Sequence, residues 1–199
     1  MHKAVIILTK AEDKEEARKK VFDFMSSQVG KVCDWFVIGG RWSGIFTAEK
    51  LDRTKLRKVN EEFERKYGWY VDKNNSEEDR FKQYCEIFYK YFPDFKGTPP
   101  AWRNVYLFIG YPDDVAPLKE VMGLVKRWLQ SIEDTIKEYQ KDLRDDNLKY
   151  LHDFIKRRIA ELQAQVFCDD TNVFNLERGD YSIPDDPEGW YAVIVDMHV

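Results

Sequence analysis

The stretch Asp34-Trp35-Phe36-Val37-Ile38-Gly39-Gly40-Arg41-Trp42-Ser43-Gly44 decides how the rest of the chain is interpreted. Its apolar run ends in two glycines, which have no Cβ and therefore let a backbone approach another group closely. We expect a strand over residues 35–42, in which period two places Arg41 on the same face as Trp35. A simpler interpretation is a Gly-Gly bulge whose arginine pairs with a carboxylate. The expected ligand-binding residues are Asp34, Trp35, Gly39, Gly40, Arg41 and Trp42.

The composition bounds the class of protein. The chain has 199 residues, of which 43% are hydrophobic, so it can bury a core, and we expect a single domain over residues 1–199. The net charge is only -4, so there is no overall basic field and no clear nucleic-acid signature. Abundant Glu, Lys and Arg are compatible with a thermophilic source.

Cysteine usage and hydropathy predict the compartment. Cys33, Cys85 and Cys168 are widely spaced and form no CxxC pair, which argues against a disulfide framework or a zinc knuckle. The N-terminal segment lacks a signal-peptide pattern, and no run approaches the roughly 18 apolar residues that span a bilayer. We therefore expect a cytoplasmic protein with no membrane partner.

Apolar periodicity predicts an α+β fold. Continuous apolar runs predict one antiparallel sheet, with strands at residues 4–9, 35–42, 105–110 and 190–198. Apolar residues at steps of three and four predict helices at residues 13–28, two within 51–92, and two antiparallel helices within 116–166 that turn at 145–147. The element order suggests a ferredoxin-like βαββαβ sandwich. Residues 51–100 and 116–166 would be helical elaborations of it, and the region from Cys168 to Gly189 is expected to form turns.

The last strand carries the second group of candidate site residues. Asp196 and His198 are one residue apart, so both side chains can point to one face, a spacing found in metal sites and in acid/base pairs. The simpler interpretation is a carboxylate bonded to a histidine at a strand end. His2 and His152 are the other histidines, which makes a three-histidine zinc site improbable, and Asp169-Asp170 offers further oxygen ligands.

Two segments carry a resemblance. The 34–44 stretch, together with the final Val195-Asp196-Met197-His198-Val199, resembles a loose set of uncharacterised phage, bacterial and archaeal proteins. These share Asp-Trp-[aromatic]-x-Ile-Gly-Gly-Arg-Trp-[Ser/Thr]-Gly and a C-terminal Val-Asp-x-His. The resemblance implies that the two segments meet in space, and it brings no assigned activity.

Two functional classes follow from these residues. The favoured one is a binding or regulatory module, acting between a mobile element and its host, that recognises a small anionic ligand or a protein. The alternative is a metal-assisted hydrolase of phosphoesters, in which Asp196 and His198 hold a divalent metal ion, Asp34 adds a ligand or base and Arg41 stabilises anionic charge. The catalytic candidates are therefore His198, Asp196 and Arg41.

Two further expectations concern contacts. We expect Arg41 and Asp196 to form a partly buried ion pair beside His198. We also expect the helices within residues 116–166 to contact a protein partner or a second copy of the chain.

Overall fold

The protein consists of two compact units in a computed structural model that describes residues 2–68, 76–100, 114–163 and 171–199. The first unit comprises Met1–Ile38 and Val115–Val199, and the second comprises Gly39–Asp114. Each unit has its own hydrophobic core. The expectation that residues 1–199 fold as a single domain stays a prediction.

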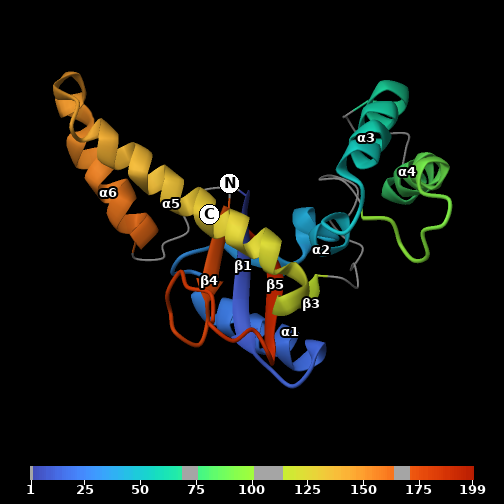
Figure 1. The fold of residues 1–199 in the computed structure, drawn as a ribbon, viewed down its shortest axis with the longest axis horizontal. Coiled ribbons are helices and arrows are strands. Elements are labelled where there is room, and N and C mark those ends of the chain that lie inside the picture. Colours follow the sequence, from blue (N-terminus) through green and yellow to red (C-terminus); the bar gives the residue numbers. More distant parts are fainter. Residues whose placement is uncertain (1, 69–75, 101–113, 164–170) are drawn as a thin grey trace. The chain divides into compact units, whose positions relative to one another are not determined.

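A mixed sheet forms the centre of the first unit (Figure 1). Among the described residues it has five strands: β1 (His2–Lys10), β2 (Trp35–Ile38), β3 (Val115–Pro117), β4 (Thr171–Asn175) and β5 (Trp190–His198). β1 and β5 pair antiparallel along their whole length, from His2 opposite His198 to Lys10 opposite Trp190. The path order is β2-β5-β1-β4, with β3 pairing with β5 beyond the end of β2.

Helices cover both faces of this sheet. On one face, α1 (Lys14–Gln28) buries Ala17, Val21 and Met25 against strand residues that alternate along β1 and β5; these are Val5, Ile7, Val193, Val195 and Met197. Figure 1 shows α5 (Leu118–Asp142) crossing the opposite face. Because both faces are covered, β1 and β5 are continuous apolar runs and do not alternate between apolar and polar residues.

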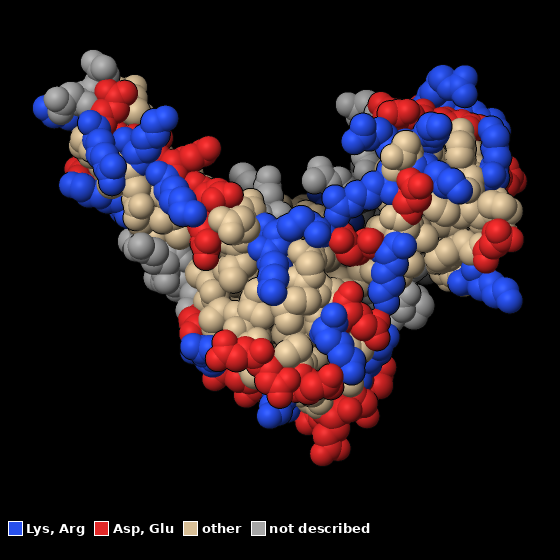
Figure 2. Space-filling model, viewed as in Figure 1, with Lys and Arg blue, Asp and Glu red and all other residues tan. Residues whose placement is uncertain are grey.

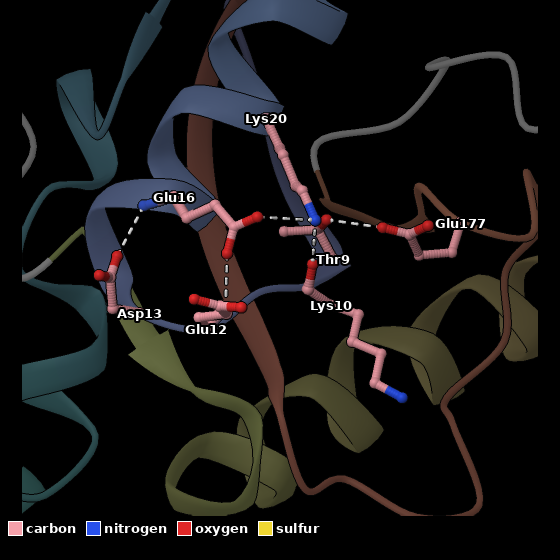
Figure 3. Close-up of polar contacts among 7 residues, drawn as sticks. All are labelled: Thr9, Lys10, Glu12, Asp13, Glu16, Lys20 and Glu177. Carbon is pink, nitrogen blue, oxygen red and sulfur yellow. Dashed lines mark hydrogen bonds and ion pairs between the residues drawn. The ribbon is translucent and has the colours of Figure 1, made fainter.

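Polar contacts fix the start of α1 after β1 (Figure 3). Asp13 is the N-cap and accepts a 2.8 Å hydrogen bond from the backbone N–H of Glu16. The Glu16 carboxylate accepts in return from the N–H of Glu12 at 2.7 Å, which makes a variant of the capping box in which the donor is the residue before the N-cap. Lys20 donates to the carbonyl of Lys10 at 2.7 Å and lies 3.2 Å from Glu16, so the strand and the helix are tied together.

A helical hairpin extends from the first unit. After α5, the short 3-10 helix η2 (Asp146–Leu151) reverses the chain, and α6 (His152–Gln163) runs back beside α5 (Figure 1). The predicted antiparallel pair of helices that turns at residues 145–147 is thereby confirmed. None of the described helices is long and apolar enough to cross a membrane.

The second unit is a helical assembly with an aromatic core. Its described helices are η1 (Gly40–Trp42), α2 (Ile45–Ala48), α3 (Arg53–Tyr67) and α4 (Glu77–Tyr91). α3 and α4 bury Val59, Phe63, Tyr84, Ile87 and Phe88 against each other. The two helices predicted within residues 51–92 are confirmed.

Several strand predictions need correction. The strand predicted over residues 35–42 ends at Ile38, because Gly39 has a φ of 82° and residues 40–42 form a 3-10 turn. Arg41 therefore shares no strand face with Trp35. The predicted strand at residues 105–110 lies outside the described residues.

The predicted ferredoxin-like topology is not confirmed, because the strand order differs and the sheet is not wholly antiparallel. β4 runs parallel to β1 within the region expected to form turns. β3 occupies positions expected to begin a helix; Pro117 disfavours helical geometry at Ala116, so α5 starts only at Leu118. The more general prediction of an α+β fold is confirmed.

Candidate functional site

The strand register brings three aromatic rings together at one end of the sheet. His198 is opposite His2 on one side and opposite Trp35 on the other. Directly opposed residues on neighbouring strands share a face, so all three side chains project from the same side. The His198 ring stacks on Trp35, with centroids 5.2 Å apart and planes 4° from parallel. His2 meets both rings edge to face, at 5.1 Å from Trp35 and 5.2 Å from His198.

Each of the two histidines is bonded to a different carboxylate. Nδ1 of His2 is 2.8 Å from Oδ1 of Asp196, and Nδ1 of His198 is 3.2 Å from Oδ2 of Asp34. An ionised carboxylate only accepts hydrogen bonds, so Nδ1 of each ring carries the proton and Nε2 is the basic nitrogen. These five residues, His2, Asp34, Trp35, Asp196 and His198, are called the histidine cluster below.

Burial differs sharply between the two pairs. The Asp196 side chain is 1% exposed and that of His2 is 17% exposed, whereas the Asp34 side chain is 73% exposed. Trp35 is also exposed, and His198 partly so. The Asp196–His2 pair is therefore the buried part of the cluster, and Asp34 and Trp35 face the solvent.

Cys33 is next to Asp34 but does not add a nucleophile. It is buried, and burial together with the negative charge of Asp34 raises the pKa of its thiol. A raised pKa keeps the sulfur protonated, and the thiol is a poor nucleophile. The sequence also places no histidine next to Cys33, which is flanked by Val32 and Asp34.

The metal site expected at Asp196 and His198 stays a prediction. In the described parts of the chain, no group of three or more His, Cys, Asp and Glu side chains is placed to hold a metal ion. Asp196 is instead bonded to His2, and Asp34 to His198. His152 lies on α6, where its ring bonds to the carbonyl of Asp145 at 3.3 Å. Asp169 and Asp170 lie outside the described residues.

The predicted close approach at the two glycines occurs within the second unit. A Cβ added to Gly39 would overlap the Ser43 hydroxyl and lie 3.1 Å from Oδ2 of Asp114. Ser43 and Asp114 are both buried, so the space beside Gly39 is filled by the protein's own side chains. Gly40, Arg41 and Trp42 form the following 3-10 turn. Arg41 and Asp196 belong to different units, and the ion pair between them stays a prediction.

Sequence reasoning missed the role of His2. Asp34, Trp35, Asp196 and His198 were all singled out, but the partner of Asp196 in the first unit is a histidine at the start of β1. The available signal was that β1 and β5 are apolar runs of similar length, each with a histidine near one end.

Comparison of the chain with protein-family models, with curated proteins and with solved structures found no match. The resemblance carried by the 34–44 stretch and the C-terminal strand therefore stays a prediction.

Proposed function

We propose that this is a binding protein whose ligand site is the histidine cluster. The supporting observation is the pair of imidazoles 5.2 Å apart, each oriented by its own carboxylate, beside the exposed ring of Trp35. Holding a buried carboxylate against an imidazole costs desolvation energy that an apolar pair would avoid. A buried carboxylate–imidazole pair beside an exposed aromatic ring is therefore more simply explained by recognition of a ligand than by a contribution to stability alone.

The exposed side of the cluster favours a cationic or hydrogen-bond-donating ligand. The Asp34 side chain, which is 73% exposed, offers carboxylate oxygens that accept hydrogen bonds. Trp35 adds an exposed aromatic face on which a planar or cationic group can lie. The proposed ligand is therefore a small planar molecule with an amine or amidine donor. The anionic ligand inferred from Arg41 is a separate proposal, which depends on the second unit.

Three small molecules of the same shape test this choice. Benzamidine is a planar cation, benzamide is neutral, and benzoate is an anion with the same ring. Calorimetric titration should detect benzamidine binding, weaker benzamide binding and no benzoate binding. Trp35→Ala should abolish the benzamidine signal, whereas Phe154→Ala, an exposed aromatic on α6, should leave it unchanged. Preferential binding of benzoate would contradict the proposed ligand class.

A second candidate function is hydrolysis of a phosphoester, which the Asp196–His2 pair favours. A histidine whose Nδ1 is held by a buried carboxylate has Nε2 as a positioned general base that can activate water. Hydrolysis of bis(p-nitrophenyl) phosphate, measured with a chelator and with added zinc or manganese, tests this function. His2→Asn should abolish any turnover. Turnover that is unaffected by His2→Asn would reject the role of His2, and turnover that depends on added metal would restore the metal-assisted alternative.

The helical hairpin is the proposed contact surface for a protein partner, and we assign that partner as a second copy of the chain. Tyr150 is 79% exposed, and Leu151 and Phe154 are also exposed on η2 and α6. Lys, Arg, Asp and Glu are interspersed on the same hairpin (Figure 2), and such a mixed surface can complement itself under a twofold axis. Sedimentation should show a concentration-dependent dimer that the double variant Tyr150→Ser/Phe154→Ser dissociates. A monomer at all concentrations would reject this contact.

A regulatory role between a mobile element and its host is part of the proposal that this is a binding protein.

A further inference from the structure

A groove lies between α1 and the edge strand β2, apart from the histidine cluster. It has a volume of about 410 Å³ and is lined by Glu15, Arg18, Lys19, Phe22, Phe36, Val37 and Ile38. All of these residues belong to the first unit. The volume is within the range of about 300–1,000 Å³ that is typical of ligand pockets.

The lining residues place the groove along the outer edge of β2. Phe36 and Ile38 point to the face covered by α1, where they pack against the hydrophobic core of the first unit. Val37 points to the other face. A groove bounded by side chains from both faces must pass along the backbone edge between them. Within the described part of the sheet, β2 is the terminal strand and pairs only with β5. The groove therefore exposes a strand edge with backbone N–H and C=O groups.

The groove combines an apolar wall with a mainly cationic rim. Phe22 is exposed on α1, and its ring lies 5.5 Å from that of Phe36. Arg18 and Lys19 stand one turn before Phe22 on the same helix, and Glu15 one turn before them. Two cations against one carboxylate favour a ligand with acidic groups.

We propose that an extended acidic peptide binds in this groove by adding a strand to the outer edge of β2. The peptide backbone would form ladder hydrogen bonds with β2, as in other strand-addition complexes in which a peptide lies between an edge strand and a helix. Because Phe22, Arg18 and Lys19 all lie on α1, the peptide side chains that contact them must share one face of the added strand. On that face, apolar side chains would contact Phe22 and Phe36, and acidic side chains would approach Arg18 and Lys19. The proposal does not depend on the histidine cluster, whose Trp35 and His198 are absent from the groove lining.

The probes are fluorescein-labelled Val-Thr-Glu-Thr-Val-Thr-Glu, which places valine and glutamate on one face of a strand, and its matched control Val-Thr-Lys-Thr-Val-Thr-Lys. Fluorescence anisotropy should show saturable binding of the glutamate peptide that is roughly fivefold or more tighter than that of the lysine peptide. Lys19→Glu should weaken binding of the glutamate peptide by a similar factor, and Phe22→Ser by roughly tenfold. Val29→Ser, also an exposed apolar residue but absent from the groove lining, should change nothing.

Amide hydrogen exchange distinguishes strand addition from non-specific electrostatic binding of the peptide. The glutamate peptide should slow exchange within residues 35–38, and this protection should be lost in Phe22→Ser. Binding without protection of β2 would overturn the proposal. The absence of saturable binding would overturn it as well. A concentration-dependent dimer that is dissociated by Val37→Lys would assign the edge to a second copy and would also overturn it.

Discussion

His2 and His198 are register partners in neighbouring antiparallel strands, and their rings meet edge to face with centroids 5.2 Å apart. Each ring is bonded to a carboxylate of its own, Asp196 for His2 and Asp34 for His198. The two pairs are chemically alike but differ in burial, so they make different contributions to folding and to binding.

The buried pair should matter for stability and the exposed pair should not. His2→Ala is expected to lower the free energy of unfolding by about 1–3 kcal/mol, because it removes a hydrogen-bond partner from a buried carboxylate. Asp34→Ala is expected to cost less than about 0.5 kcal/mol, because Asp34 is exposed. Urea unfolding measures both changes. Equal losses for the two variants would contradict the assigned burial.

The capping box of α1 should make stability depend on pH. Hydrogen bonds from the Glu12 backbone and from Lys20 lower the pKa of Glu16 below its ordinary value. Since the folded-state pKa lies below the unfolded one, the contribution to stability is present above the unfolded pKa and is lost as the pH falls through the folded pKa. Glu16→Gln should therefore flatten the fall in melting temperature between about pH 5 and pH 3. Glu15→Gln, an exposed change on the same turn, should leave that slope unchanged.

The thiols of the described cysteines should be unreactive in the folded protein. Burial raises the pKa of Cys85 to about 11, and burial with the nearby Asp34 charge raises that of Cys33. Because the thiolate is the reactive form, a Cys168→Ser variant should react slowly with Ellman's reagent near neutral pH and rapidly in urea. Rapid labelling of Cys85 or Cys33 in the folded variant would show that its thiol is not protected.

Gly39 should tolerate alanine worse than another glycine with a positive φ that has open space around it. Gly39 and Gly68 have positive φ values of 82° and 67°, but a Cβ at Gly68 would meet nothing within 4 Å. Gly68→Ala should cost about 1–3 kcal/mol for the backbone conformation alone, because a φ of 67° with a ψ of 174° is adopted readily only by glycine. Gly39→Ala should cost about 1–3 kcal/mol more, because Ser43 and Asp114 crowd the added methyl group. Equal costs by urea unfolding would show that the close approach contributes nothing.

Periodicity predicted the elements that bury apolar faces. β1, β5 and α1 followed from continuous or helically spaced apolar residues, and the α5–α6 hairpin followed from two apolar stripes separated by a charged break. β4 was missed because Thr171–Asn175 is short and contains two asparagines, which have low strand propensity. Its parallel pairing with β1 supplies the stability that local sequence does not indicate.

The candidate site was predicted only in part, because spacing along a strand does not determine the register between strands. Asp196 and His198 could be placed on one face of β5 from period two alone. The position of His2 depends on how β1 aligns with β5, and the period-two pattern along each strand does not specify that alignment. At Gly39, the sequence indicated a close approach, but the φ of 82° that ends the strand became visible only in the fold.

Histidine NMR during a benzamidine titration is the most direct test of the proposed binding site. The chain has three histidines, so the Cε1–H spectrum contains His2, His198 and His152, and His152 on α6 is an internal control outside the cluster. Benzamidine binding at the histidine cluster should produce saturable shifts of the His2 and His198 signals with the same dissociation constant and no shift of His152. Benzoate should produce no shifts. Unchanged His2 and His198 signals at saturating benzamidine, or equal shifts of all three histidines, would contradict a ligand site at the histidine cluster.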